Sequence, residues 1–176
     1  KQVGGETAVD GYTDIEEIDV TFDGLVTPVP STGSWPSRLK TRGKIMEDGG
    51  ISFKVEGLNK FTRVGLVKPN NGNTANHYLD YGIYLRFVDN EYKVYIVNNG
   101  ADQSTGRTYT PGDAFKVKRE GNYIKCYHNS GVPFTSVAYV GNGEALTGKV
   151  AFSGPGGGLS QLSLYGPNID KVLQNV

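Results

Sequence analysis

Two asparagine-rich segments carry the side chains best suited to bind a polar ligand. The first holds Asn70, Asn71, Asn73 and Asn76 ahead of His77 and Asp80, and the second holds Asn98, Asn99 and Asp102. Carboxamides donate and accept hydrogen bonds in pairs, and carboxylates accept them, which suits the hydroxyl groups of a sugar. Asparagine is equally common in plain loops, because it tolerates left-handed backbone. The candidate ligand-binding residues from these segments are Asn71, Asn73, Asp80, Asn98, Asn99 and Asp102.

Aromatic rings supply a second kind of binding chemistry. Trp35, the single tryptophan, could stack on the apolar face of a sugar ring or plug one end of a β-sandwich core. Tyr84, Tyr95 and Tyr127 are out of phase with the apolar residues of their segments. Together with Arg86 they could form the floor of a binding site or the packing layer between two sheets. We add Trp35 and Tyr84 to the candidate ligand-binding residues.

Arrangements typical of catalysis or metal binding are absent from the sequence. His77, His128 and the lone Cys126 have no spacing typical of a zinc site or of a nucleophile with its base. No stretch matches the Asp-x-Asp-x-Asp-Gly pattern of a calcium loop, although the asparagine-rich segments leave calcium open as the weaker alternative. Cys126 lies in an apolar alternation, where cysteine usually acts as a small buried hydrophobe. We expect no catalytic residues, no metal site and no cofactor.

Strands must position these candidate residues, because the dominant period of the sequence is two. Segments with this alternation or with a short apolar run are 18–22, 51–55, 64–67, 81–87, 92–96, 115–117, 124–126, 138–140, 150–152 and 162–164. Turn signals such as Pro111-Gly112 and Glu120-Gly121-Asn122 recur between them. We predict an all-β sandwich or barrel with about ten to twelve strands and no sustained helix.

Length and charge limit the domain count and the class of partner. A chain of 176 residues fits one domain. We predict a loose N-terminal arm over residues 1–13 and a single β-sandwich domain over residues 14–176. The 18 basic and 18 acidic residues balance, so no overall field favours nucleic acid as a partner. No stretch approaches the roughly 20 apolar residues of a membrane span, so we expect none.

Several motifs in the middle of the chain resemble those of a known superfamily. They are Arg63-Val64-Gly65-Leu66, Asp80-Tyr81-Gly82-Ile83-Tyr84-Leu85, Tyr109-Thr110-Pro111-Gly112-Asp113 and Ile124-Lys125-Cys126-Tyr127-His128-Asn129-Ser130-Gly131. In this order the chain resembles concanavalin A-like lectin and glucanase domains, especially those of bacterial surface adhesins, and more distantly laminin-G-like and SPRY modules. The resemblance implies a two-sheet antiparallel jelly-roll sandwich, with a concave face that relatives often use for glycans.

The resemblance also raises the question of glycoside hydrolysis. Laminarinase-type relatives carry their catalytic carboxylates on a strand reading Glu-x-Asp-x-x-Glu or Glu-x-Asp-x-Glu, whose alternation places the acids on one face. Glu17 and Asp19 match the start of this pattern, but Thr21 and Phe22 stand where the final acid should be. We therefore predict that the protein is not an enzyme.

Two functions remain. The first is a non-catalytic carbohydrate-binding or adhesion module, extracellular or at a cell or virion surface, whose partner is a glycan or another surface polymer. The alternative is a structural or assembly subunit of a phage, virus, extracellular filament or coat, with copies of itself or other assembly proteins as partners. The polar N-terminal segment and the neutral charge favour this alternative.

Overall fold

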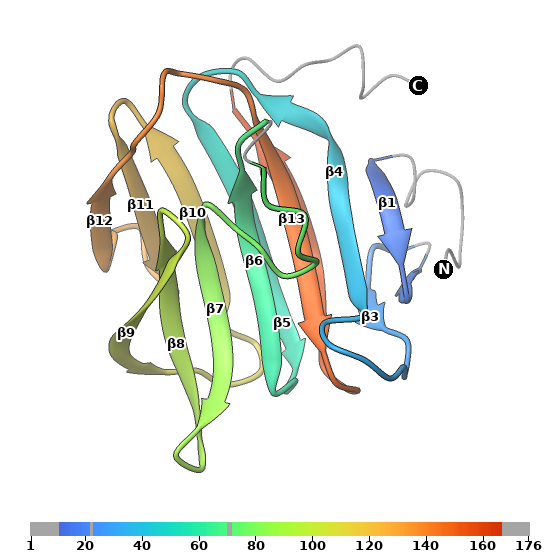
Figure 1. The fold of residues 1–176 in the computed structure, drawn as a ribbon. Helices are drawn as coiled ribbons and strands as arrows, with labels where there is room; N and C mark the ends of the chain where they lie inside the picture. Colours follow the sequence, from blue (N-terminus) through green and yellow to red (C-terminus); the bar gives the residue numbers. More distant parts are fainter. Residues whose placement is uncertain (1–10, 22, 70–71, 167–176) are drawn as a thin grey trace.

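The computed structural model describes residues 11–21, 23–69 and 72–166, which form fourteen strands and no helix. The strands make two antiparallel sheets of seven strands each, stacked as a sandwich (Figure 1). The predicted all-β class and two-sheet architecture are therefore confirmed. Within the described ranges the chain has no helix that is long and apolar enough to cross a membrane.

Sheet A has the strand order β1-β4-β13-β6-β7-β8-β9. Its strands are β1 (Tyr12–Glu16), β4 (Ser37–Ile45), β13 (Leu146–Ser153), β6 (Phe61–Val67), β7 (Tyr81–Val88), β8 (Glu91–Asn98) and β9 (Ala101–Thr108). The predicted hairpin is β7 with β8, in which Ile83 lies opposite Ile96 and Tyr84 opposite Tyr95. β13 lies between β4 and β6, so strands far apart in the sequence are side by side (Figure 1).

Sheet B has the strand order β12-β11-β10-β5-β14-β3-β2. Its strands are β12 (Thr135–Ala138), β11 (Tyr123–His128), β10 (Ala114–Glu120), β5 (Gly49–Gly57), β14 (Gly158–Tyr165), β3 (Val26–Pro28) and β2 (Ile18–Val20). The predicted turn at Gly121-Asn122 joins β10 to β11, and in their ladder Val117 lies opposite Cys126. Alternation therefore located the strands on both sides of this turn.

The core lies between the two sheets and includes many residues that the period-two pattern placed inside. Its members include Val64, Ile83, Leu85, Val94 and Ile96 from sheet A, and Ile51, Phe53, Phe115, Val117, Ile124 and Cys126 from sheet B. Burial raises the pKa of the Cys126 thiol to about 12, so the thiol stays protonated. Cys126 is thus the buried hydrophobe that its place in the alternation predicted.

Strands β1, β4 and β9 of sheet A and β3 of sheet B were missed by the sequence prediction. In β4 the buried positions alternate with half-buried cations, but three of those buried positions are Ser37, Thr41 and Gly43, so the apolar signal is weak. β9 lies at the end of the sheet, and all its residues except Thr105 are exposed. An edge strand without a buried face has no alternation to detect.

The segment predicted as an N-terminal arm overlaps a strand. Residues 1–10 lie outside the described residues, but β1 begins at Tyr12, which pairs with Thr41 of β4. The Tyr12 hydroxyl also donates a 3.4 Å hydrogen bond to the carbonyl oxygen of Leu162. The last two residues of the predicted arm are thus part of sheet A, and the boundaries of the arm and of the single domain stay predictions.

A pair of facing glycines lets β6 and β7 approach closely. Gly65 lies opposite Gly82 in the ladder, two positions along from the pair of Arg63 and Tyr84. A Cβ at Gly65 would lie 2.2 Å from the carbonyl oxygen of Tyr81 and 2.6 Å from the Cα of Gly82. Real Cβ atoms do not approach backbone this closely, so a larger residue would force the two strands apart.

We predict that Gly65→Ala lowers the free energy of unfolding by more than about 2 kcal/mol, because the clash is with backbone that cannot rotate away. Gly131→Ala is the matched control, since a Cβ at Gly131 meets nothing within 4 Å. The control should change stability by less than about 1 kcal/mol. Urea titrations followed by fluorescence measure both values, and equal stability of the two variants would contradict the prediction.

Candidate functional site

The outer face of sheet A, on the side away from the core, carries a cluster of aromatic rings. Its members are Trp35, Phe61, Tyr84 and Tyr95, packed with Val67, Leu79 and Val97. The ring centres of Trp35 and Tyr84 are 5.7 Å apart, and those of Tyr84 and Tyr95 are 6.1 Å apart. Tyr84 and Tyr95 therefore lie outside the sandwich, and the alternative that they form the layer between the sheets is wrong.

Trp35 is held at this face by the loop that joins β6 to β7. Its ring stacks on that of His77, with centres 5.4 Å apart, and its carbonyl oxygen accepts a 3.1 Å hydrogen bond from Nδ2 of Asn76. Burial, followed by the positive charges of Arg63 and Lys149, lowers the pKa of His77, which favours a neutral ring. Trp35 thus packs on the outside of sheet A, and the alternative that it plugs the end of the core is wrong.

Arg63 of β6 joins the parts of this cluster. Its side chain is 5% exposed, Nε donates a 2.8 Å hydrogen bond to the carbonyl oxygen of His77, and Nη1 lies 3.2 Å from Oδ1 of Asp102. The guanidinium also lies 4.5 Å from the centre of the Tyr84 ring, which favours a cation–π contact. The sequence analysis did not select Arg63 as a site residue. The available signal was a cation directly before the apolar run 64–67.

Asp80 and Asn73 play different parts in the loop. The buried Asp80 carboxylate accepts hydrogen bonds from the backbone N–H of Lys68 at 2.7 Å and from the hydroxyl of Tyr78 at 3.0 Å, so it ties the two ends of the loop together. Asn73 accepts a hydrogen bond from the N–H of Ala75 and lines the cavities beside the loop. The predicted site residue Asn71 lies outside the described residues.

The second asparagine-rich segment divides between a turn and the aromatic cluster. Asn98 ends β8 and Asn99 follows with a φ of +49°, and the N–H of Gly100 then donates to the carbonyl oxygen of Asp80. Asn99 fits the view that asparagine stands there because it tolerates left-handed backbone, whereas Asn98 is the last residue of a strand. Asp102, by contrast, pairs with Arg63 and so belongs to the candidate site.

Two adjoining cavities lie between the loop and strands β4 and β13. Figure 1 shows this loop, in green, passing in front of β6 and β13. The cavities have volumes of about 240 and 280 Å³ and share Lys40, Asn73, Thr74 and Lys149. Together with the aromatic cluster they give this face hydrogen-bonding groups next to flat apolar surfaces, which is the composition of many small-ligand sites.

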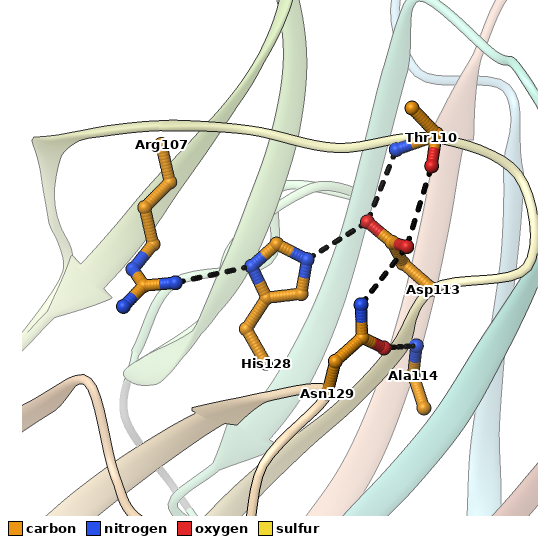
Figure 2. A network of polar contacts seen from close by, with 6 residues as sticks. All are labelled: Arg107, Thr110, Asp113, Ala114, His128 and Asn129. Atoms are coloured by element: carbon orange, nitrogen blue, oxygen red, sulfur yellow. Dashed lines mark hydrogen bonds and ion pairs between the residues drawn. The ribbon is translucent and has the colours of Figure 1, made fainter.

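A separate polar network lies at the other sheet. Figure 2 shows the Asp113 carboxylate in contact with His128, Asn129 and Thr110. The carboxylate lies 2.8 Å from Nε2 of His128 and accepts a 3.0 Å hydrogen bond from Nδ2 of Asn129 and a 3.1 Å hydrogen bond from the N–H of Thr110. Burial would raise the pKa of Asp113, but the hydrogen bonds from His128, Asn129 and Thr110 outweigh it and lower the pKa. The network joins the start of β10 to the end of β11 and acts as a structural brace.

Neither a hydrolase pair nor a metal cluster emerges in the described part of the chain. β1 ends at Glu16 in sheet A and β2 begins at Ile18 in sheet B, with Glu17 between them at a φ of +49°. Alternation had suggested that Glu17 and Asp19 lie on one continuous strand, but the structure separates them. Among the described residues, no group of three or more His, Cys, Asp or Glu side chains is placed to hold a metal ion.

Comparison with known proteins identifies the fold. No protein family and no curated protein matches the sequence. The metal-free carbohydrate recognition domain of Emp46p matches with a TM-score of 0.62 at 12% identity over 89% of this chain and 88% of that one. The SPRY domain of human HERC1 matches with a TM-score of 0.58 at 14% identity over 90% and 96%. The carbohydrate binding module CBM66 from Bacillus subtilis matches with a TM-score of 0.56 at 13% identity over 89% and 96%. The chain therefore has the predicted concanavalin A-like jelly-roll fold.

We predict that Asp113→Asn lowers the free energy of unfolding at neutral pH by roughly 1–2 kcal/mol, because it removes a carboxylate that the network stabilises. A carboxyl group with a lowered folded-state pKa stabilises the fold above its unfolded pKa of about 3.9, and this stabilisation is lost as the pH falls through the folded-state value. The difference between wild type and variant should therefore shrink in acid. Urea titrations across this pH range measure it.

The matched control is Asp89→Asn, because the Asp89 carboxylate is 77% exposed and forms a surface ion pair with Lys93. It should change stability by less than about 0.5 kcal/mol at any pH. If Asp113→Asn lowered the free energy of unfolding by the same amount at neutral and acid pH, the result would show that the charge of the Asp113 carboxylate does not stabilise the network.

Proposed function

We propose that the protein is a non-catalytic binding domain that holds a glycan against the outer face of sheet A. We further propose that it acts outside the cell, or on a cell or virion surface. The observation that carries the proposal is the grouping of Trp35, Tyr84 and Tyr95 beside the two polar cavities. A flat apolar surface next to convergent polar groups suits a sugar, whose ring faces are apolar and whose edges carry hydroxyls.

Direct contacts connect the aromatic and the polar parts of the face. Asn76 lines one cavity and donates a hydrogen bond to the backbone carbonyl oxygen of Trp35, so one loop residue contacts both the cavity and Trp35. Arg86 lies 5.4 Å from the centre of the Tyr95 ring at the other side of the cluster. A chain of several sugar units could thus contact Tyr95, Trp35 and the cavity in succession, which suits a polymer better than a single small molecule.

Two of the structural neighbours support a carbohydrate ligand. One is titled a carbohydrate recognition domain and another a carbohydrate binding module, and both share the fold over most of this chain. A non-catalytic role is favoured because Glu17 lies in the bend between β1 and β2 while Asp19 lies in β2, whereas hydrolysis of a glycoside needs two carboxyl groups fixed on either side of one bond.

We predict that Trp35→Ala and Tyr95→Ala each weaken the binding of an oligosaccharide by on the order of tenfold, since each removes a flat apolar surface. Tyr123→Ala is the control, because this tyrosine is 53% exposed and belongs to sheet B. A screen of the purified protein against neutral and acidic oligosaccharides identifies the ligand, and calorimetry then compares the variants. Failure of the wild type to bind any member of a broad panel would contradict the proposal.

An open sheet edge favours assembly as a second candidate function. β9 ends sheet A, and its outer backbone groups have no neighbouring strand among the described residues. Such an edge can pair with a strand of another copy. If it does, analytical ultracentrifugation should find oligomers that Ser104→Lys disperses, because an added lysine on an edge disfavours strand pairing. A wild-type protein that stays monomeric at high concentration would contradict the assembly role.

A further inference from the structure

Five basic residues lie on the neighbouring strands β4 and β13 of sheet A, although the chain as a whole is neutral. The four half-buried residues that alternate with buried ones along β4 are Arg38, Lys40, Arg42 and Lys44. Lys149 of β13 lies directly opposite Lys40 in the ladder that joins the two strands. Like charges at directly opposite positions destabilise a sheet, so this arrangement costs folding free energy unless an anion balances it.

The cavities beside the loop collect most of these cations. Among the described residues that line them, five are basic, namely Arg38, Lys40, Lys44, Lys68 and Lys149, and Asp14 is the single acid. Asp14 is engaged with Arg38, at 3.4 Å. Within the described part of the chain, no carboxylate forms an ion pair with Lys40, Lys44 or Lys149. We call this lining the basic groove.

Lys149 is the most deeply placed cation of the groove. The residue is 5% exposed but lines both cavities, and its Nζ donates a 3.1 Å hydrogen bond to the carbonyl oxygen of Ala75. An ammonium group has three N–H donors, so two remain beyond this bond. The groove therefore offers buried donors with positive charge, which an anionic group of a ligand would satisfy.

The charges around Lys149 also make it sensitive to an anion. Burial, then Lys40 and Arg38 of β4, lower its pKa to about 8, with Arg63 of β6 acting in the same sense and Asp14 of β1 opposing them. An anion in the groove would favour the charged ammonium and raise this pKa. Anion binding should accordingly be stronger below the pKa than above it.

We propose that the basic groove binds the carboxylate or sulfate groups of an acidic glycan. The inference rests on the proposed function, because it names the class of glycan that the outer face of sheet A holds. The neighbouring rings of Trp35 and Tyr95 would contact sugar units while the groove takes their acidic substituents. A glycan fits better than nucleic acid, since the five basic residues line one groove of a neutral chain rather than an extended surface.

The test is calorimetric titration of the full chain with three hexasaccharides: a sulfated heparin fragment, an oligogalacturonate and a neutral maltohexaose. We expect at least one acidic hexasaccharide to bind, with affinity that falls as salt is added. Lys149→Met and Lys40→Gln should each weaken it roughly tenfold, the effect of losing one charge-assisted hydrogen bond. Wild-type affinity should fall between about pH 7 and about pH 9.5, and Lys149→Met should lack most of that fall.

Lys54→Gln is the matched control, because Lys54 is a half-buried cation of β5 in sheet B. Thermal unfolding verifies that each variant is folded. If Lys149→Met does not fold, Lys40→Gln alone tests the groove. Equal weakening by Lys54→Gln, or no effect of Lys149→Met and Lys40→Gln, would overturn the groove. Inorganic polyphosphate is the second anion, and binding as tight as that of the acidic glycans would overturn the assignment to glycans.

The same titrations separate this inference from the proposed function. Binding of maltohexaose that depends on Trp35, without binding of either acidic hexasaccharide, would leave the glycan-binding function standing and overturn the basic groove. Binding of an acidic hexasaccharide that depends on Lys149 but not on Trp35 or Tyr95 would support the basic groove. It would contradict the proposal that the aromatic cluster contacts the sugar units. Absence of binding by all three hexasaccharides would overturn the groove inference.

Discussion

Two buried cations hold the loop between β6 and β7 against sheet A. A loop that lies on a sheet face buries backbone carbonyl groups, and each of them needs a hydrogen-bond donor. Arg63 donates to the carbonyl oxygen of His77, and Lys149 donates to that of Ala75. Because His77 stacks on Trp35, the aromatic cluster and the adjoining cavities depend on this attachment of the loop. The candidate site is thus a product of side chains that satisfy a backbone constraint.

The two cations differ in what balances their charge. Arg63 has the Asp102 carboxylate at 3.2 Å and the Tyr84 ring beneath its guanidinium, so its charge is compensated within the fold. Burial, then the charges of Lys40 and Arg38, lowers the pKa of Lys149, and no carboxylate among the described residues forms an ion pair with it. Sites that bind ligands commonly retain such unfavourable interactions in the free protein, because the ligand relieves them. This contrast is why we assign the acidic groups of the ligand to Lys149 rather than to Arg63.

Much of the fold follows from local patterns. Strands β5, β7, β8, β10 and β11 have one apolar face, and a period of two predicts both the strand and the residues that point inward. β4 escaped detection because serine, threonine and glycine occupy three of its inward positions, and the Thr41 hydroxyl satisfies the carbonyl of Gly43 and the N–H of Gly148 where its pairing with β13 shifts. The roles of polar residues are harder to predict from the sequence. Asn99 shapes a turn and Asp80 holds the ends of a loop together. Residue type alone does not distinguish these structural roles from ligand binding.

The sequence by itself determined the all-β class and the inward faces of the regular strands, but it left open whether Tyr84 and Tyr95 lie outside the sandwich or between the sheets. Tertiary structure alone decided which outward residues meet. β13 lies between β4 and β6, which places Lys149 opposite Lys40, and β6 pairs with β7, which places Arg63 opposite Tyr84. The physical reason is that alternation depends on neighbours along one strand, whereas the order of strands in a sheet depends on how all of them together bury their apolar faces.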